Sequence, residues 1–207
     1  MMRKTVILAI LAMFSFSGAV LAQKKNYEIT VDGKKYDIGL NETLKAKTKG
    51  GKEVSIVLAK KKFAEFADKF VSFEHKSDLN VNSQDLGDGI RQLMMATAMG
   101  TVVMVQEYSN LDPSMLVPML LKEVTKESVQ YGHTMKQEAA TRTLASGATL
   151  TGLKATLSYQ GAESYWEVLA LSKKDKGILI VTHVSKEFMV NDGDVLRRFW
   201  KTLAAKF

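Results

Sequence analysis

The sequence contains no cysteine and only three histidines among its 207 residues. Without cysteine there can be no disulfide and no thiolate metal ligand, so the fold must be stabilised by its hydrophobic core. The histidines, His75, His133 and His183, lie far apart, and none belongs to an H-E-x-x-H pattern. We therefore expect no metal site and no cofactor.

The usual catalytic signatures are also missing. No serine stands in a G-x-S-x-G elbow, and no glycine-rich phosphate loop joins a strand to a helix. The acidic stretches QDLGDG and NDGD lack the twelve-residue spacing and closing glutamate of a calcium loop, so turns and helix caps explain them. Glu163 and Glu167 are expected on a strand, facing solvent. We expect a protein that is not an enzyme.

Beyond the N-terminus there is no apolar run long enough to cross a membrane. The uncharged stretch from Leu93 to Val105 has 13 residues. As a helix it would measure about 20 Å, against the roughly 30 Å of a bilayer core. Gly100 interrupts it, and its second half is rich in β-branched residues. We predict two buried strands joined near Gly100, in a sheet with both faces covered.

The N-terminus has the pattern of a secretory signal peptide. The basic MMRK precedes the apolar TVILAILAMFSFSGAV, and small residues end at Ala22. We expect residues 1–22 to be removed between Ala22 and Gln23, with a second candidate cut after Ala19; an uncleaved anchor helix is the alternative. Since Gln23 stands where a lipoprotein has cysteine, no lipid anchor is expected. The mature protein should be soluble and periplasmic or secreted.

Positive charge is concentrated in the next segment. Residues 23–62 carry 11 lysines, no arginine and 5 acidic residues, whereas the rest of the chain is close to neutral. This cluster could contact an anionic membrane surface or envelope polymer, or it could keep a small sheet soluble and protect its edges. Because neither arginine nor aromatic residues are interleaved, nucleic acid is not expected as a partner. The lysines concerned are Lys45, Lys47, Lys49, Lys52, Lys60, Lys61 and Lys62.

The same segment is expected to form a β-hairpin unit over residues 23–62. Alternating apolar residues flank Asp32-Gly33, the strongest two-residue hairpin signal, and a second hairpin turns at residues 49–52. After it, Phe63, Phe66 and Phe70 recur at helical spacing, which favours a short helix joining this unit to the main domain.

The main domain is expected over residues 63–207 as an α+β fold. An extended segment near residue 71 and a polar turn over 83–89 precede the two buried strands. A helix follows from Asp112 to Gly132, with Pro118 either at its regular start or at a kink. Four strands and an amphipathic helix that runs to Phe207 complete the chain. This order predicts a mainly antiparallel sheet flanked by helices.

From Phe70 to Phe207 this order resembles the PsbP-like superfamily. The resemblance is carried by GTVVMVQEYSNLDPSMLVPMLLKEV, YWEVLALSKKDKGILIVTHVS and the terminal DVLRRFWKTLAAKF. It implies an α/β/α sandwich whose members bind proteins or serve as accessory subunits, without a shared catalytic constellation. It supplies no site residue for this chain, and it does not cover the hairpin unit.

Two functions follow as hypotheses. The first is an exported, non-enzymatic binding or accessory protein that acts through contacts with another envelope protein. The alternative is a small-ligand or lipid-binding protein with an apolar pocket formed by Met94, Met104, Tyr165 and Trp166, although methionine clusters more often fill a core. A histidine, an acid and a hydroxyl converging in one cleft would instead indicate an enzyme.

Overall fold

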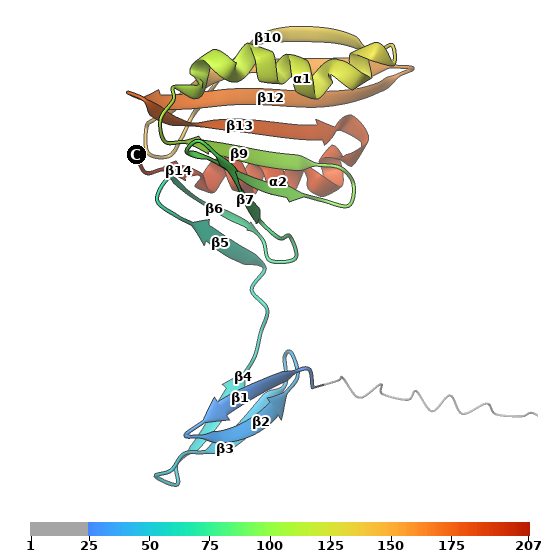
Figure 1. Cartoon of the computed structure of the whole chain (residues 1–207). Helices are drawn as coiled ribbons and strands as arrows, with labels where there is room; N and C mark the ends of the chain where they lie inside the picture. Colours follow the sequence, from blue (N-terminus) through green and yellow to red (C-terminus); the bar gives the residue numbers. More distant parts are fainter. Residues whose placement is uncertain (1–24) are drawn as a thin grey trace, which may run out of the picture. The chain divides into compact units, whose positions relative to one another are not determined.

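The computed structural model describes residues 25–207 (Figure 1). The predicted signal peptide, with Ala19, Ala22 and Gln23 at its two candidate cleavage sites, lies outside these residues. The described chain divides into two compact units between Lys60 and Lys61. Each unit is described by itself.

The first unit consists of two hairpins, as the sequence predicted. Asp32 and Gly33 have φ angles of 52° and 83°, the left-handed conformations that a tight hairpin turn requires. Ile38 and Ala46 are its buried core residues. Asp32 also accepts a hydrogen bond of 2.8 Å from the backbone N–H of Lys49, which links the two turns. The strands are β1 (Tyr27–Val31), β2 (Lys34–Ile38), β3 (Thr43–Lys47) and β4 (Glu53–Val57).

The second unit is built on a seven-stranded sheet with the spatial order β10-β11-β12-β13-β9-β8-β7. All neighbouring strands are antiparallel, which confirms the predicted α+β class. The two strands predicted on either side of Gly100 are present as β8 and β9. The strand bounds are β7 (Asn82–Gly87), β8 (Ile90–Ala96), β9 (Val102–Tyr108), β10 (Thr134–Thr143), β11 (Thr149–Tyr159), β12 (Ala162–Lys173) and β13 (Lys176–Ser185).

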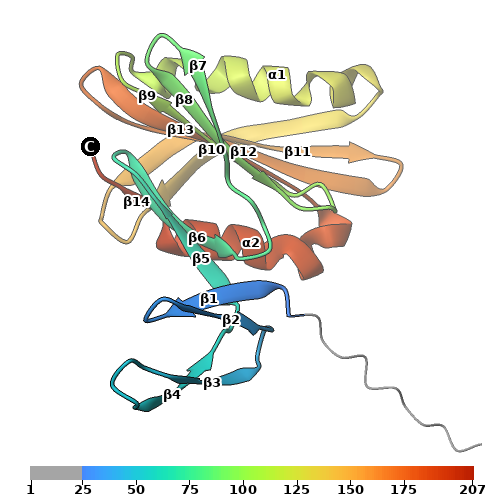
Figure 2. The ribbon, with the colours of Figure 1, turned by 60° about the horizontal axis from the view of Figure 1, so that its bottom comes forward.

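One helix covers each face of this sheet (Figure 2). Helix α1 (Val117–Gln130) follows the short 3-10 turn η1 (Pro113–Leu116), and α2 (Met189–Thr202) follows η2 (Lys186–Phe188). Pro118 lies in the first turn of α1, where its missing N–H costs no helical hydrogen bond. No helix within residues 25–207 is long and apolar enough to cross a membrane.

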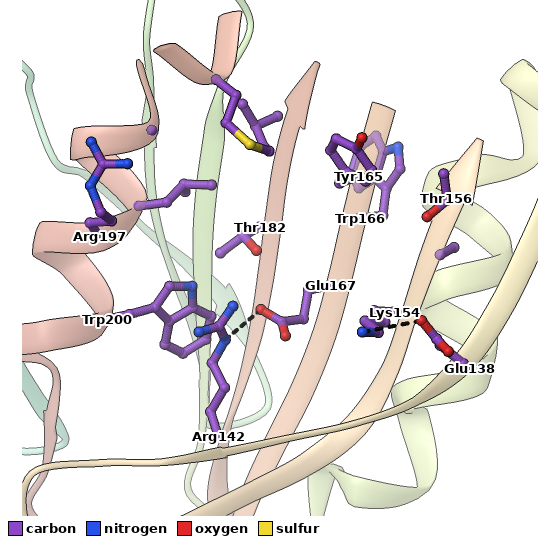
Figure 3. Close-up of a pocket in the computed structure, with 15 residues that line it drawn as sticks. Glu138, Arg142, Lys154, Thr156, Tyr165, Trp166, Glu167, Thr182, Arg197 and Trp200 are labelled. Atoms are coloured by element: carbon purple, nitrogen blue, oxygen red, sulfur yellow. Dashed lines mark hydrogen bonds and ion pairs between the residues drawn. The ribbon is translucent and has the colours of Figure 1, made fainter. Parts of the chain in front are cut away.

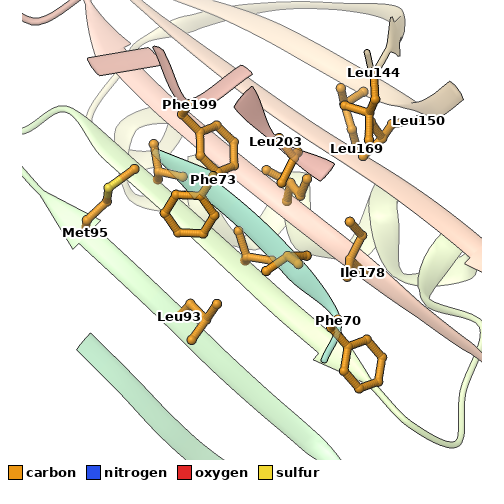
Figure 4. Close-up of a cluster of buried hydrophobic side chains, with 14 of the residues drawn as sticks. Phe70, Phe73, Leu93, Met95, Leu144, Leu150, Leu169, Ile178, Phe199 and Leu203 are labelled. Atoms are coloured by element: carbon orange, nitrogen blue, oxygen red, sulfur yellow. The ribbon is translucent and has the colours of Figure 1, made fainter. Parts of the chain in front are cut away.

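Each face of the sheet has its own hydrophobic cluster, so the unit is an α/β/α sandwich. On the α1 side, Leu121 packs over β9, β11, β12 and β13. On the α2 side, Phe199 lies among residues from β6, β8, β9 and β13 (Figure 4). Burial on both faces explains why β13 reads as a nearly continuous apolar run. The prediction of two covered faces is wrong for β8, because Met94 on that strand is exposed.

A three-stranded sheet, in the order β14-β6-β5, lies on the α2 side. It corrects the helix predicted over residues 63–70, because β5 (Phe63–Ala67) and β6 (Val71–Lys76) form a hairpin. Asp68 closes the turn by accepting hydrogen bonds from the backbone N–H groups of Phe70 and Val71 at 2.7 and 2.8 Å. Stacking of Phe66 on Phe73, with ring centroids 5.3 Å apart, favours the strand pair over the local helical spacing.

Two further boundaries differ from the prediction. The polar stretch over 83–89 is mostly strand β7, an exposed edge strand with no apolar alternation to reveal it. The last helix ends at Thr202, because Leu203 turns the chain into β14 (Ala204–Ala205), which pairs with β6. Phe207 therefore packs beside Phe70 outside the helix, with ring centroids 5.7 Å apart.

Phe199 is the residue whose loss should cost the main unit most. Its side chain is fully buried, and its ring lies 5.1 Å from that of Phe73. We expect Phe199→Ala to lower the free energy of unfolding by about 3–5 kcal/mol, because it leaves a cavity between α2 and β6. Denaturant titration followed by tryptophan fluorescence measures this, since Trp166 and Trp200 are the chain's only tryptophans and both lie in this unit. The exposed Lys201→Ala on the same helix should change stability by less than about 0.5 kcal/mol; equal losses in the two variants would contradict the assignment.

Candidate functional site

On the α2 side of the sheet, the strand register shows where the apolar surface ends. The row Ala140, Gly152, Leu169 and Ile180 is apolar and lies in or beside the α2-side cluster. The next row on the same face is Glu138, Lys154, Glu167 and Thr182, four polar side chains opposite one another on β10, β11, β12 and β13. The hydrophobic core therefore ends at a line of alternating charges.

Along this line a groove lies between α2 and the sheet (Figure 3). Its volume is about 570 Å³. The floor is formed by Thr156, Tyr165, Glu167, Thr182 and Val184 of the sheet. The wall is one face of α2, on which Gly193, without a side chain, adds room; the residues of this wall are Met189, Gly193, Leu196, Arg197 and Trp200.

Arg142 is fixed at the centre of the groove. Its Nε donates a hydrogen bond of 2.7 Å to Glu167, and its guanidinium lies 4.6 Å from the centroid of the Trp200 ring. The β11 residue between Arg142 and Glu167 in the register is Gly152, where a side chain would clash with the backbone carbonyl of Val168 on β12. Glu167 is 13% exposed and Arg142 is 43% exposed, so the pair is anchored at the floor and reaches solvent.

The groove offers donors, acceptors and apolar surface together. Lys154 pairs with Glu138 at 3.1 Å, and both side chains are about half-exposed. Arg197 of α2 is paired with Asp194 and is also largely exposed. These charged groups are accessible at the rim, whereas Val184, Leu196 and Met189 line the same groove with apolar surface. The site can bind a ligand that is apolar in one part and hydrogen-bonding in another.

The four residues of the predicted apolar pocket do not line one cavity. Met94 and Met104 lie opposite each other on β8 and β9, and Met104 packs against the α1-side cluster. Trp166 packs against that same cluster and lies 4.3 Å from the ring of His183. Tyr165 is next to Trp166 on strand β12, so its side chain points to the opposite face of the sheet. The α2 groove thus includes Tyr165 and Trp166 in its lining but neither methionine.

The lysines of the predicted anionic-surface contact are all exposed. Lys45 and Lys47 alternate with the buried Ala46 on β3, so they lie on the outer face of the hairpin. Lys49 and Lys52 belong to its turn. Only Lys45 has an acidic partner among these four within the described residues, Glu53 at 3.6 Å. The other three, Lys60, Lys61 and Lys62, follow β4 along the chain.

A second cavity, of about 620 Å³, brings two of the three histidines together at the end of the sheet near the end of α1. Its lining includes His133, His183, Ser128 and Glu163. Among the described residues, however, no hydrogen bond joins a serine hydroxyl to either imidazole. His183 Nδ1 instead lies 2.9 Å from the carbonyl oxygen of Gly100, and burial lowers the pKa of this histidine. Glu163 accepts from Tyr165 and Lys186 at 2.8 and 2.9 Å. The cavity therefore holds a histidine, an acid and hydroxyls without a triad.

A third cavity, of about 210 Å³, borders a buried ion cluster. Arg91 Nε donates to Glu107 at 2.8 Å, and Arg91 also forms an ion pair with Asp68 of the β5–β6 turn. Glu107 is 2% exposed, and burial raises the pKa of its carboxyl. Its Oε1 has no hydrogen-bond partner within the described chain. No cluster of three or more His, Asp or Glu side chains with metal-binding geometry occurs in residues 25–207.

The groove residues Arg142, Glu167 and Trp200 were not found by sequence reasoning. Glu167 was expected to face solvent, whereas it lies on the floor of the groove. The available signal was the charged residues of three consecutive strands, Glu138 and Arg142, Lys154, and Glu167. Their alignment depends on the strand register, and their partial burial depends on where α2 lies, which no local pattern states.

The chain was compared with protein families, curated sequences and solved structures. No protein-family model matches the chain, and neither does any curated protein sequence. Among solved structures, the chain is similar to the solution structure of cyanobacterial PsbP (CyanoP) from Synechocystis sp. PCC 6803, with a TM-score of 0.47 and 10% identity over 70% of this chain and 92% of that one. It is also similar to a crystal structure from Bacteroides thetaiotaomicron VPI-5482, with a TM-score of 0.40 and 11% identity over 71% and 50% of the two chains.

Buried Glu107 should make stability depend on pH in a defined direction. Because the pKa of Glu107 is raised in the folded protein, its stabilising contribution is complete at acid pH and is lost as the pH rises through that raised value. Glu107→Gln removes this titration. We therefore expect the variant to gain stability relative to the parent as the pH rises from the ordinary carboxyl range to neutrality.

The measurement is the difference in unfolding free energy between Glu107→Gln and the parent at several pH values. The exposed Glu123→Gln serves as control for the loss of one surface charge. A difference that stays constant with pH, or that moves in the opposite direction, would show that Arg91 outweighs burial at this carboxyl.

Proposed function

We propose that this protein is an exported, non-enzymatic binding protein of the cell envelope, and that it holds a segment of a partner protein in the α2 groove. The single observation that carries the proposal is the groove itself, where an ordered row of charges meets an apolar wall. No substrate chemistry is assigned to the site.

The mixture of groups in the groove supports a polypeptide as its occupant. A peptide presents backbone donors and acceptors beside apolar side chains, and the groove presents Lys154, Glu138 and Arg142 beside Val184 and Leu196. Its charged groups are of both signs and are largely paired with one another. Charges that are already paired attract a strongly charged ligand only weakly, but they can orient a peptide that has both polar and apolar groups.

A small amphipathic ligand is the second candidate. The volume of about 570 Å³ lies within the range of small-molecule sites, and Tyr165 and Trp200 supply aromatic surface. A purified small ligand would change the fluorescence of Trp200, whereas a partner protein would be retained at the same site by crosslinking.

The basic β3–β4 hairpin supports the envelope as the place of action. Lys45 and Lys47 on its outer face, with Lys49 and Lys52 in its turn, form a cationic surface of the kind that anionic lipid headgroups or polymers attract. This contact would be sensitive to salt and would add to, without replacing, the binding in the groove.

Filling the groove should abolish binding. Thr156 lies on its floor and is half-buried, so Thr156→Trp places an indole in the space without cutting into the core. Ser158→Trp is the matched control, since Ser158 is half-buried on the same strand and face but lies outside the groove lining. With a photo-crosslinking residue at Lys154, we expect in-cell capture of a defined partner protein, reduced at least tenfold by Thr156→Trp and unchanged by Ser158→Trp.

Capture that is equal in the parent and both variants would place the contact elsewhere and refute the groove as the site. If no protein is captured but the fluorescence of Trp200 responds to an envelope lipid extract, the second candidate replaces the first. If neither occurs, the proposed binding function fails.

If the protein is exported as proposed, the N-terminus of the mature chain can be predicted. We expect the protein isolated from the envelope fraction of the producing cell to begin at Gln23, or at Val20 if the cut follows Ala19. Mass spectrometry of its N-terminal peptide distinguishes the two. A chain that retains Met1 and stays with the membrane pellet after a high-salt wash would instead identify an anchor helix.

A further inference from the structure

Strand β10 leaves the main sheet with an unprotected edge. It pairs with β11 in unbroken register from Thr134 opposite Ser158 to Thr143 opposite Thr149, and it contains neither proline nor glycine. The opposite edge strand, β7, is shorter and has a register shift between Asp85 and Gly87. Bulges and short length are features that prevent edge pairing, whereas a long regular edge favours it. Of these two edges, β10 is the one built to accept another strand.

The backbone groups that β10 offers are identified by its hydrogen bonding to β11. The N–H of Leu144 donates to the carbonyl of Ala148 at 2.8 Å, so these two residues form a hydrogen-bonded pair. Hydrogen-bonded and open pairs alternate along an antiparallel ladder. The even-numbered residues of β10 therefore bond to β11, and the odd-numbered ones direct N–H and C=O groups to the free edge. These are Met135, Gln137, Ala139, Thr141 and Thr143.

We propose that β10 pairs with β10 of a second copy of this chain, antiparallel about a two-fold axis at Gln137. In this register Met135 faces Ala139 of the partner subunit, and Gln137 faces its own equivalent. The outward groups of these residues would form about six backbone hydrogen bonds. Lys136 then lies opposite Glu138 of the partner subunit, twice by symmetry, which is the charge complementarity that selects this partner.

The charges also make the neighbouring register less stable. A two-fold axis at Ala139 would place Lys136 opposite Arg142 of the partner subunit, again twice, and like charges directly opposite each other destabilise a strand pair. Shifting the axis to Thr141 leaves fewer residues paired. Glu138 can accept the second cation because its side chain is about half-exposed while paired with Lys154. The inference rests on the edge and its charges, and it does not depend on the proposed function of the groove.

The absence of cysteine makes the register directly testable. In the proposed dimer the two Gln137 Cα atoms lie about 5.5 Å apart, within disulfide range, so Gln137→Cys should crosslink to a dimer under mild oxidation. Ala139→Cys is the matched control, because the two Ala139 Cα atoms would be about 14 Å apart in this register. Crosslinking of Ala139→Cys in preference to Gln137→Cys would overturn the proposed axis.

Sedimentation equilibrium of the purified cysteine-free protein provides the second test. We expect a monomer–dimer equilibrium whose dissociation constant rises roughly tenfold in Lys136→Glu, where each strand pair gains two like-charge contacts. Gln137→Pro should abolish the dimer without removing a hydrogen bond to β11, and unchanged tryptophan fluorescence would show that it is folded. A parent protein that stays monomeric at its highest soluble concentration, or a dimer insensitive to both changes, would refute the inference.

Discussion

The contact between Phe199 of α2 and Phe73 of β6 determines how the α2 side of the main unit is arranged. The ring of Phe73 lies between those of Phe66 and Phe199, so aromatic packing runs from β5 through β6 into α2. Because α2 and the small sheet share one face of the large sheet, neither covers that face completely. The part left open, over β10, β11 and β12, is where the charged row and the groove occur.

The charged row contributes little to the stability of the sheet. Taking Glu167 and Arg142 partly out of water costs free energy that their mutual attraction only roughly offsets, and well-packed apolar residues would often be as stable. Pairing Lys154 with Glu138 at a half-exposed site contributes little for the same reason. We therefore attribute the stability of the unit to the two apolar clusters, which leaves the polar row available for the binding proposed for the groove.

Sequence patterns predicted those elements whose local signal agrees with their tertiary environment. The Asp32-Gly33 hairpin, the strands on either side of Gly100 and the order of the last four strands were all foreseen, because turn chemistry and burial indicate the same structure. The helix predicted over Phe63–Phe70 was wrong, since three phenylalanines at helical spacing also suit a hairpin when a partner strand brings Phe73 against them. Strand β7 escaped detection because both of its faces are exposed.

The candidate site was less predictable than the fold, for a geometrical reason. Tyr165 and Trp166 are adjacent in the sequence, but their side chains point to opposite faces of β12. The predicted pocket therefore joined residues that the sheet separates, whereas the observed groove joins Arg142, Glu167 and Trp200 from distant parts of the chain. To predict such a site from the sequence, one needs the register of four strands and the position of α2. Both are determined by the packing of the whole unit.

The proposed groove and the proposed dimer share one residue, and this has a thermodynamic consequence. Glu138 pairs with Lys154 at the rim of the groove, and in the dimer it would also face Lys136 of the partner subunit. An occupant that draws Lys154 away would leave Glu138 more fully available to the second subunit, whereas one that engages Glu138 itself would compete with it. By linkage, dimerisation must then change the affinity of the groove by the same factor as its occupant changes dimerisation. The edge strand that ends the sheet thus connects the two surfaces.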